Sequence, residues 1–457
     1  MGKYLYTDEE QNVNMALKYQ DEQLNNITAK VLGNSDDTDA EIKRLESFLN
    51  KRGINPHRLE ANSNAIQQKK ILVVPSWEQL CAEAEASVGK NCDLESFFTE
   101  DELKSNEEYI EDLRNEFNQL HRLDKIDVTI SAIAGIVAGV VDILLVGIPH
   151  RGRSGLEAGP LSDYIRAYFD KVYPPDEMEK LANSKASKVS FDAQDNRHTR
   201  VHVEGLSAYY HRLLQLGHDP VLGFVVGVMD IMTGRMTTID KAGNLVSQTM
   251  ENYQDRVEPN VFKAIAKEFL HLKSDITTSM GLPAPLMGLF NLMQFGSVGE
   301  EELTVAEIVQ GMYYEGYDFI HFCASSIPVM ITEVIVRLCY AIKRVKEGHT
   351  IKESIPVSLN REKHPKLATM LFIANSAATG INLGKVLFTK NPLAINYPQW
   401  LAFAKYSYGQ LKWNLINKPE AREAYVEKRL NDEMTDLIKQ IDKNFEEFSK
   451  DYTVVFN

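Results

Sequence analysis

An apolar run of 22 residues sets the first limit on how this chain folds. Residues 128–149 read VTISAIAGIVAGVVDILLVGIP, about one bilayer thickness if they form a helix. Gly135 and Gly139 have the small-x-x-x-small spacing that permits close helix contact. Asp142 interrupts the run, and a charged side chain near a bilayer centre costs roughly 3 kcal/mol. Because the mean hydropathy is only −0.27, we expect a helix buried in a protein core rather than a membrane span.

Apolar helical segments recur along the middle of the chain, separated by Gly and Pro. They cover 128–147, 205–216, 220–233, 261–279, 284–295, 304–322, 328–346, 366–389 and 397–416. Between two of them, RMTTIDKAGNLVSQ alternates around a Lys-Ala-Gly-Asn turn and predicts a small β-hairpin. The predicted fold is mostly α, with a large multi-helix core domain at 126–416.

The two ends of the chain differ from this core domain. Residues 1–125 are polar and acidic and predict a mainly helical N-terminal region. Residues 417–457 predict a long amphipathic C-terminal helix, because apolar side chains recur every three or four residues from Leu430 to Phe448. We expect this stripe to pack along the core or against a partner, either a second copy of the chain or another protein.

Charge and cysteine content exclude several classes of protein. A net charge of −14 without a basic stripe argues against nucleic-acid binding. The four cysteines are scattered and form no C-x-x-C pair, which argues against a disulfide framework. The N-terminal stretch MGKYLYTDEEQNVN has no apolar signal region. We therefore predict a cytoplasmic protein, with peripheral membrane contact left open.

Three aspartates stand inside apolar helical segments, each followed by isoleucine: Asp142, Asp230 and Asp275. A lone ionised carboxylate in an apolar core costs several kcal/mol. Either its pKa rises or a positive or hydrogen-donating group meets it. A divalent cation would satisfy several carboxylates at once. We predict that the three aspartates gather at one buried pocket, with Asp142 and Asp275 as metal ligands.

The helix predicted at 261–279 carries further candidate ligands. Glu268, His271 and Asp275 line one flank of its core face, at i, i+3 and i+7. Glu-x-x-His is also a ligand spacing of di-metal helix bundles. His271 with Asp275 therefore predicts a site for zinc, manganese or iron. The alternative is the solvated flank of an ordinary amphipathic helix.

The stretch GHDPVLGFVVGVMDIMTG, residues 217–234, adds a histidine. Asp219 suits a helix N-cap and Pro220 the first helical position, so capping explains both. His218 has no capping role, so we predict that it is a metal ligand or a proton carrier. We take His218 and Asp230 as the candidate catalytic residues.

A basic, glycine-rich loop follows the first apolar run. In GIPHRGRSGLEAGP, Arg151 and Arg153 predict substrate binding through a phosphate group. A solvated basic loop without a ligand is the alternative.

Two resemblances follow from these motifs. The segment from Asp127 to about Gln410 resembles a family of helical bacterial proteins carried on mobile elements, which implies a setting in phage defence or competition. The motifs that carry it are VVDILLVG, GHDPVLGFVVGVMDIMTG, FLHLKSDI, MGLPAPL, SIPVMITEVIVRLCYAIKR and NSAATGINLG. Separately, His218 to Pro220 with the apolar helix ending in Asp230 is similar to membrane-bound metal-dependent hydrolases. Gly227 stands where that pattern has a further histidine.

Three functions remain open from the sequence. The first is a metal-dependent hydrolase, acting on a phosphoester, because a divalent ion beside a basic loop suits that chemistry. The second is a membrane-perturbing effector that inserts its glycine-rich apolar helix. The third is a helical scaffold that binds a partner protein.

Overall fold

A computed structural model describes residues 5–51, 70–90, 92–152, 155–296, 302–450 and 452–456. The fold is mostly α, as predicted, with a few two-stranded sheets. Its contacts divide the chain into two compact units. Unit 1 joins Met1–Gln119 with Pro419–Asn457, and unit 2 is Leu120–Lys418.

Unit 1 contains long helices and one parallel strand pair. Its elements are α1 (Asp8–Lys51), β1 (Lys70–Val74), α2 (Trp77–Val88), η3 (Leu94–Phe97), α3 (Glu100–His121), α15 (Lys418–Phe448) and β6 (Tyr452–Phe456). Arg114 on α3 forms an ion pair of 2.9 Å with Glu423 on α15. The apolar stripe of α15 is exposed, from Leu430 to Phe448, so contact with a partner through this helix stays a prediction.

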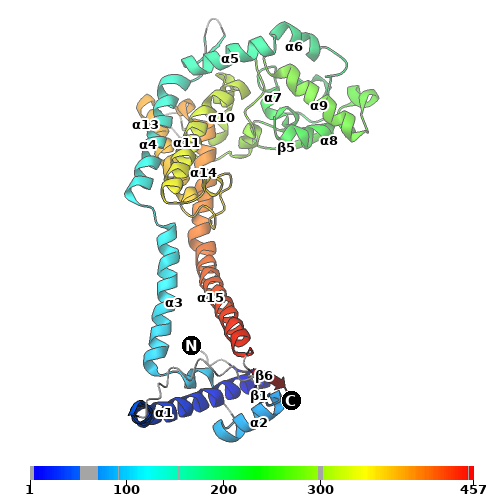
Figure 1. The fold of residues 1–457 in the computed structure, drawn as a ribbon. Helices are drawn as coiled ribbons and strands as arrows, with labels where there is room; N and C mark the ends of the chain where they lie inside the picture. Colours follow the sequence, from blue (N-terminus) through cyan, green and yellow to red (C-terminus); the bar gives the residue numbers. More distant parts are fainter. Residues whose placement is uncertain are drawn as a thin grey trace. The chain divides into compact units, whose positions relative to one another are not determined.

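Four helices of unit 2 pack side by side as a bundle (Figure 1). They are α4 (Lys125–Val141), continued by the π-helical turn η4 (Asp142–Val146), then α11 (Phe319–Lys346), α13 (Leu367–Thr389) and α14 (Tyr397–Lys412), which η11 (Trp413–Asn417) extends. Asp124 caps α4 in a reciprocal pair with Asp127. Gly135 brings α13 close, because a Cβ there would lie 2.3 Å from the carbonyl oxygen of Ala374.

The expectation that residues 128–147 form a buried core helix is wrong for half of that helix. Gly135, Ala138 and Gly139 are buried against neighbouring helices. Ile133 and Leu144, in contrast, are 53% and 65% exposed. The reason is that α4 packs against α11 and α13 on one side only. Three helical segments of the described chain are long and apolar enough to cross a membrane: Glu100–Val146, which includes α4 and η4, Phe319–Lys346 (α11) and Leu367–Thr389 (α13).

The rest of unit 2, residues 147–318, forms a second body of short helices that we call the lobe (Figure 1). Its helices are α5 (Pro160–Val172), α6 (Pro175–Ala182), η5 (Asn196–His198), α7 (His211–Leu214), η6 (Leu216–His218), η7 (Leu222–Phe224), α8 (Val226–Thr233), η8 (Glu251–Arg256), α9 (Val261–Asp275), η9 (Met287–Leu292) and α10 (Val305–Tyr314). The predicted hairpin is confirmed as β4 (Arg235–Ile239) paired with β5 (Leu245–Thr249). Gly234 ends α8 in the left-handed conformation, with φ of 65°.

Candidate metal centre

Three ligating side chains converge inside the lobe: Asp192, His218 and His271. One ligand atom from each lies within 4.8 Å of the others. The Nε2 atoms of His218 and His271 are 3.1 Å apart, and His218 Nε2 is 3.8 Å from Asp192 Oδ1. Ligand atoms around a tetrahedral zinc ion are separated by about 3.3 Å. This group could therefore hold a divalent metal ion.

Local structure fixes His218 in this group. It ends the tight turn η6, and Asp219 Oδ1 accepts hydrogen bonds from the backbone N–H groups of Val221 and Leu222, at 2.8 and 3.0 Å. Phe191 packs edge-on against the imidazole rings of both His218 and His271, with centroids 5.2 and 5.3 Å away. This packing restricts ring rotation and keeps the two Nε2 atoms facing each other.

His271 and Asp275 lie one turn apart on the same face of α9, as the sequence predicted. Asp275 Oδ2 is 3.6 Å from the Nε2 atoms of both His271 and His218. Its other neighbour is Arg212 on α7, whose Nε lies 3.1 Å from the same oxygen. Asp275 therefore lies at the edge of the group and forms an ion pair with Arg212.

His211 on α7 is a further imidazole beside Asp192. Its Nδ1 lies 3.1 Å from the carbonyl oxygen of Ala208, so a proton on Nδ1 leaves a lone pair on Nε2. Nε2 is 3.6 Å from Asp192 Oδ1 and has no hydrogen-bond partner among the described residues. A backbone carbonyl that fixes the tautomer in this way is typical of metal-ligating histidines.

The protonation states suit a cation. Burial lowers the pKa of His211 to about 3 and also lowers the pKa of His271, so both imidazoles are neutral near pH 7. Burial by itself raises the pKa of Asp192, but a hydrogen bond from His218 and, at low pH, the charge of the protonated imidazoles around it outweigh burial and hold that pKa below its usual range. Neutral imidazoles with an ionised carboxylate are the forms that bind metals.

Glu268 is a fully buried carboxyl group next to this centre. Neither of its oxygens has a hydrogen-bond partner among the described residues. Burial raises the pKa of Glu268 well above the usual value of a carboxyl group. Gly223 and Gly227 make room for it, because a Cβ at Gly227 would lie 2.7 Å from Glu268 Oε2. Glu268 thus occupies the space beside Gly227.

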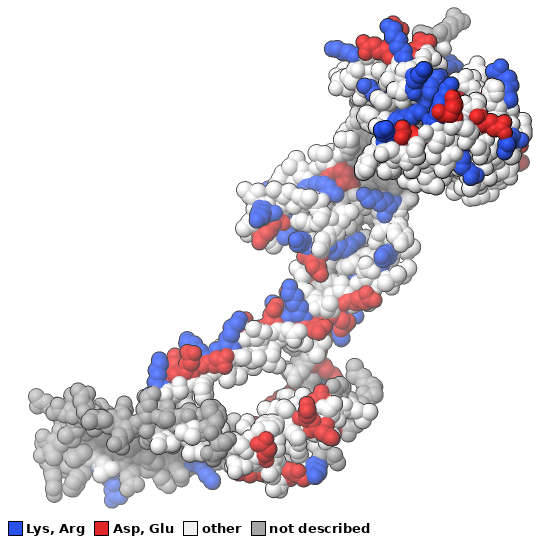
Figure 2. All heavy atoms as spheres, turned by 90° about the vertical axis from the view of Figure 1, so that its right-hand side faces the viewer, with Lys and Arg blue, Asp and Glu red and all other residues white. Residues whose placement is uncertain are grey.

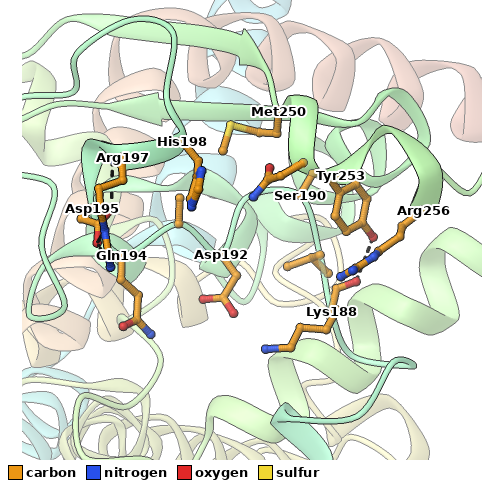
Figure 3. Close-up of a pocket in the computed structure, with 13 residues that line it drawn as sticks. Lys188, Ser190, Asp192, Gln194, Asp195, Arg197, His198, Met250, Tyr253 and Arg256 are labelled. Carbon is orange, nitrogen blue, oxygen red and sulfur yellow. Dashed lines mark hydrogen bonds and ion pairs between the residues drawn. The ribbon is translucent and has the colours of Figure 1, made fainter.

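A polar pocket of about 270 Å³ opens beside Asp192 (Figure 3). Its cationic lining comes from Lys188, Arg197 and Arg256, with His198 beside them. In Figure 3 the side chains of Asp192 and Lys188 both point into the open space. On the face of the lobe turned to the viewer in Figure 2, Lys and Arg side chains gather beside acidic ones. Asp192 and Asp195 supply the acidic part of the same lining.

The structure separates Asp142 from this centre, contrary to the prediction of one shared pocket. Asp142 lies in the helix bundle, where Lys385 Nζ is 3.2 Å from its Oδ2. The amides of Asn382 and Asn396 donate to its two oxygens at 2.9 and 2.7 Å. Its charge is neutralised by these neighbours, so a metal is not required there.

Asp230 and Arg151 are also committed to other contacts. The backbone N–H and the hydroxyl of Thr237 donate to Asp230 at 2.7 and 2.8 Å, and burial raises the pKa of Asp230 to about 6. Arg151 donates to the carbonyl oxygen of Tyr314, with its Nη2 at 3.2 Å. Neither residue belongs to the Asp192–His218–His271 group, and Arg153 lies outside the described residues.

Sequence reasoning missed Asp192 and Arg212. Asp192 stands in the irregular segment between α6 and α7, which has no periodicity that would mark a functional side. The sequence spacing did not place His211 beside His218 either. The two histidines are seven residues apart, but the helix is interrupted before Gly217, so helical periodicity does not relate their positions.

No family model, curated protein or solved structure matches this chain. The resemblances to mobile-element proteins and to membrane-bound hydrolases therefore stay predictions.

Proposed function

We propose that this protein is a metal-dependent hydrolase that acts on phosphoesters, with the ion held by Asp192, His218 and His271. The observation that carries the proposal is the convergence of these ligand atoms with matching charge states, inside the lobe and at the wall of a cationic pocket. Two facing imidazole nitrogens 3.1 Å apart can share at most one proton, and a cation between them removes the repulsion of their lone pairs.

Each neighbouring residue has a role that follows from its position. A bound divalent ion would supply Lewis-acid polarisation and lower the pKa of a water molecule. His211 directs a lone pair on Nε2 toward the side of the centre where Asp192 lies, 3.6 Å from its Oδ1, and could serve as a further metal ligand. Arg212 holds Asp275 in place through its ion pair. Glu268 lies next to the centre, and its raised pKa favours the protonated form that a general acid needs.

The pocket favours a phosphoester over other ester substrates. A phosphoryl group is anionic, and Lys188, Arg197 and Arg256 offer positive charge at the entrance. Arg197 is paired with Asp195 at 2.6 Å and Arg256 with Asp255 at 3.8 Å. Lys188 lines the same pocket and forms no ion pair with an acidic side chain in the described part of the chain, which leaves its charge available to a substrate.

The direct test is metal-dependent hydrolysis by the purified full chain. The protein is stripped with a chelator, supplied with Zn²⁺, Mn²⁺ or Fe²⁺, and assayed with p-nitrophenyl phosphate, bis-p-nitrophenyl phosphate and p-nitrophenyl acetate. We expect one of the ions to restore hydrolysis of a phosphoester and not of the acetate. A protein that binds none of the three ions would contradict the proposal.

Lys188→Ala is expected to raise KM for a phosphoester about tenfold with a smaller change in kcat, because one charge-assisted contact to the phosphoryl group is lost. Steady-state kinetics measure both constants. Lys185→Ala is the matched control, since Lys185 is exposed and does not line the pocket. Equal kinetics of the Lys188 variant and the wild type would remove Lys188 from the binding site.

The membrane-perturbing effector is the second candidate, and the apolar surface of the helix bundle bears on it. An effector of that kind hides its inserting helix in a soluble fold. The outer side chains of α4 are already exposed, which favours a resident membrane domain. Dye release from vesicles by the purified protein, without any bound metal, would support the effector instead.

A further inference from the structure

The outer face of α4 carries no charged side chain over residues 126–145, all of which the structure describes. Its exposed members are Ile126, Val128, Thr129, Ile133, Ile136, Val137, Val140, Ile143, Leu144 and Leu145. Twenty helical residues rise about 30 Å, which equals the hydrocarbon thickness of a bilayer. The two charged residues in the range, Asp127 and Asp142, are both buried and paired with lysines.

The exposed faces of α11 and α13 have the same character. Between residues 319 and 342 of α11, the exposed positions are Met330, Val334, Leu338 and Ile342, one on each successive turn. On α13, Leu387 and Phe388 are 69% and 90% exposed. Soluble monomers rarely expose a large contiguous apolar patch, and such patches mark sites that contact a membrane or another protein.

The charged groups in the middle of α4, α11 and α13 are paired: Lys385 and Asp142 are almost fully buried, whereas Arg337 and Glu333 are 27% and 25% exposed. Lys385 meets Asp142 at 3.2 Å, and Arg337 meets Glu333 at 2.7 Å. Ionisable groups in membrane helices typically pair in this way inside a helix bundle. The fourth helix, α14, adds the exposed Lys405, so the uncharged surface belongs to α4, α11 and α13.

The two ends of the bundle differ in charge. At one end Lys343 and Lys366 both meet Asp127, and residues 343–366 contain seven Lys and Arg. At the other end, the short connection 389–396 contains one, Lys390. An excess of Lys and Arg in a short loop marks the cytoplasmic side of a membrane protein.

From this surface we infer that the four-helix bundle spans a lipid bilayer, with α4, α11 and α13 in contact with the acyl chains. The connection 347–366 faces the cytoplasm, and the lobe lies on the opposite side of the membrane. A bilayer fits this surface better than a second copy of the chain. The length of exposed uncharged helix matches the hydrocarbon thickness of one bilayer, and clustered Lys and Arg side chains follow at one end of it. The inference does not depend on the proposed hydrolase activity.

The first experiment is fractionation of cells that express the full chain. The protein should stay in the membrane pellet after alkaline carbonate extraction. Ile133→Lys, which places a charge on the lipid-facing surface, should lower the membrane-inserted amount at least ~tenfold. Val201→Lys is the matched control, because Val201 is as exposed as Ile133 but lies in the lobe, at 51% against 53%.

The second experiment determines the orientation. Single cysteines replace Lys185 in the lobe and Lys352 in the loop, in a variant whose four native cysteines are alanine. A membrane-impermeant maleimide added to spheroplasts should label Lys185→Cys, and label Lys352→Cys only after permeabilisation. The reverse labelling would overturn the orientation. A carbonate-soluble protein, or a water-soluble oligomer that covers the apolar faces, would overturn the membrane span itself.

Discussion

Replacement of His218 or His271 by alanine is expected to remove the bound metal ion and lower phosphoester hydrolysis more than ~100-fold. Each histidine supplies one of three converging ligand atoms. Loss of a group that only supports a metal ligand already costs roughly 10–100-fold in metal affinity or activity, so loss of a ligand itself should cost more. Metal content by mass spectrometry and kcat/KM measure the two effects on the same samples.

The control for these variants is His202→Ala, since His202 is exposed in the lobe and belongs to none of the contacts of the centre. It should keep both the metal and the activity. Thermal unfolding of each variant separates loss of ligation from loss of folding. If His271→Ala folds and still binds the ion with wild-type stoichiometry, the assignment of His271 as a ligand fails.

Lys385→Met is expected to lower the free energy of unfolding by about 3–5 kcal/mol, because it leaves Asp142 as a buried charge without its cation. The Lys385 and Asp142 side chains are only 6% and 4% exposed. Asn382 and Asn396 would still donate to Asp142, but amides do not supply the missing positive charge. Thermal unfolding of the detergent-solubilised protein measures the change as a lower midpoint.

A double variant shows whether the charge is the cause. Asp142→Asn combined with Lys385→Met removes both charges and should recover much of the lost stability. Lys352→Met, at an exposed position in the loop, should leave the midpoint unchanged. A double variant that is less stable than Lys385→Met alone would mean that packing around Lys385, rather than its charge, determines the effect.

The sequence predicted the helices and the β-hairpin because each is encoded locally, in periodicity and turn residues. It did not predict which apolar helices have neighbours on every side. Residues 128–147 are apolar almost all round, so the pattern could not distinguish a core helix from one with an outward apolar face. That difference depends on α11 and α13, which lie far away in the sequence.

Only the part of the candidate centre that lies on a single helix was predictable from the sequence. The spacing of His271 and Asp275 placed both on the same face of α9, and the structure brings them to His218. Asp142 could not be excluded from sequence, because its cation Lys385 is 243 residues away. Asp192 could not be found either, since it stands in an irregular segment and only the fold brings it to the histidines.

The most direct test of the metal centre is anomalous X-ray scattering from crystals of the full chain, grown with the ion that restores hydrolysis and recorded on both sides of its absorption edge. We predict one strong anomalous peak, about 2.0–2.2 Å from His218 Nε2, His271 Nε2 and an oxygen of Asp192. A lobe with no peak at this position, and with the two imidazoles joined only by a shared proton, would contradict the metal-dependent function.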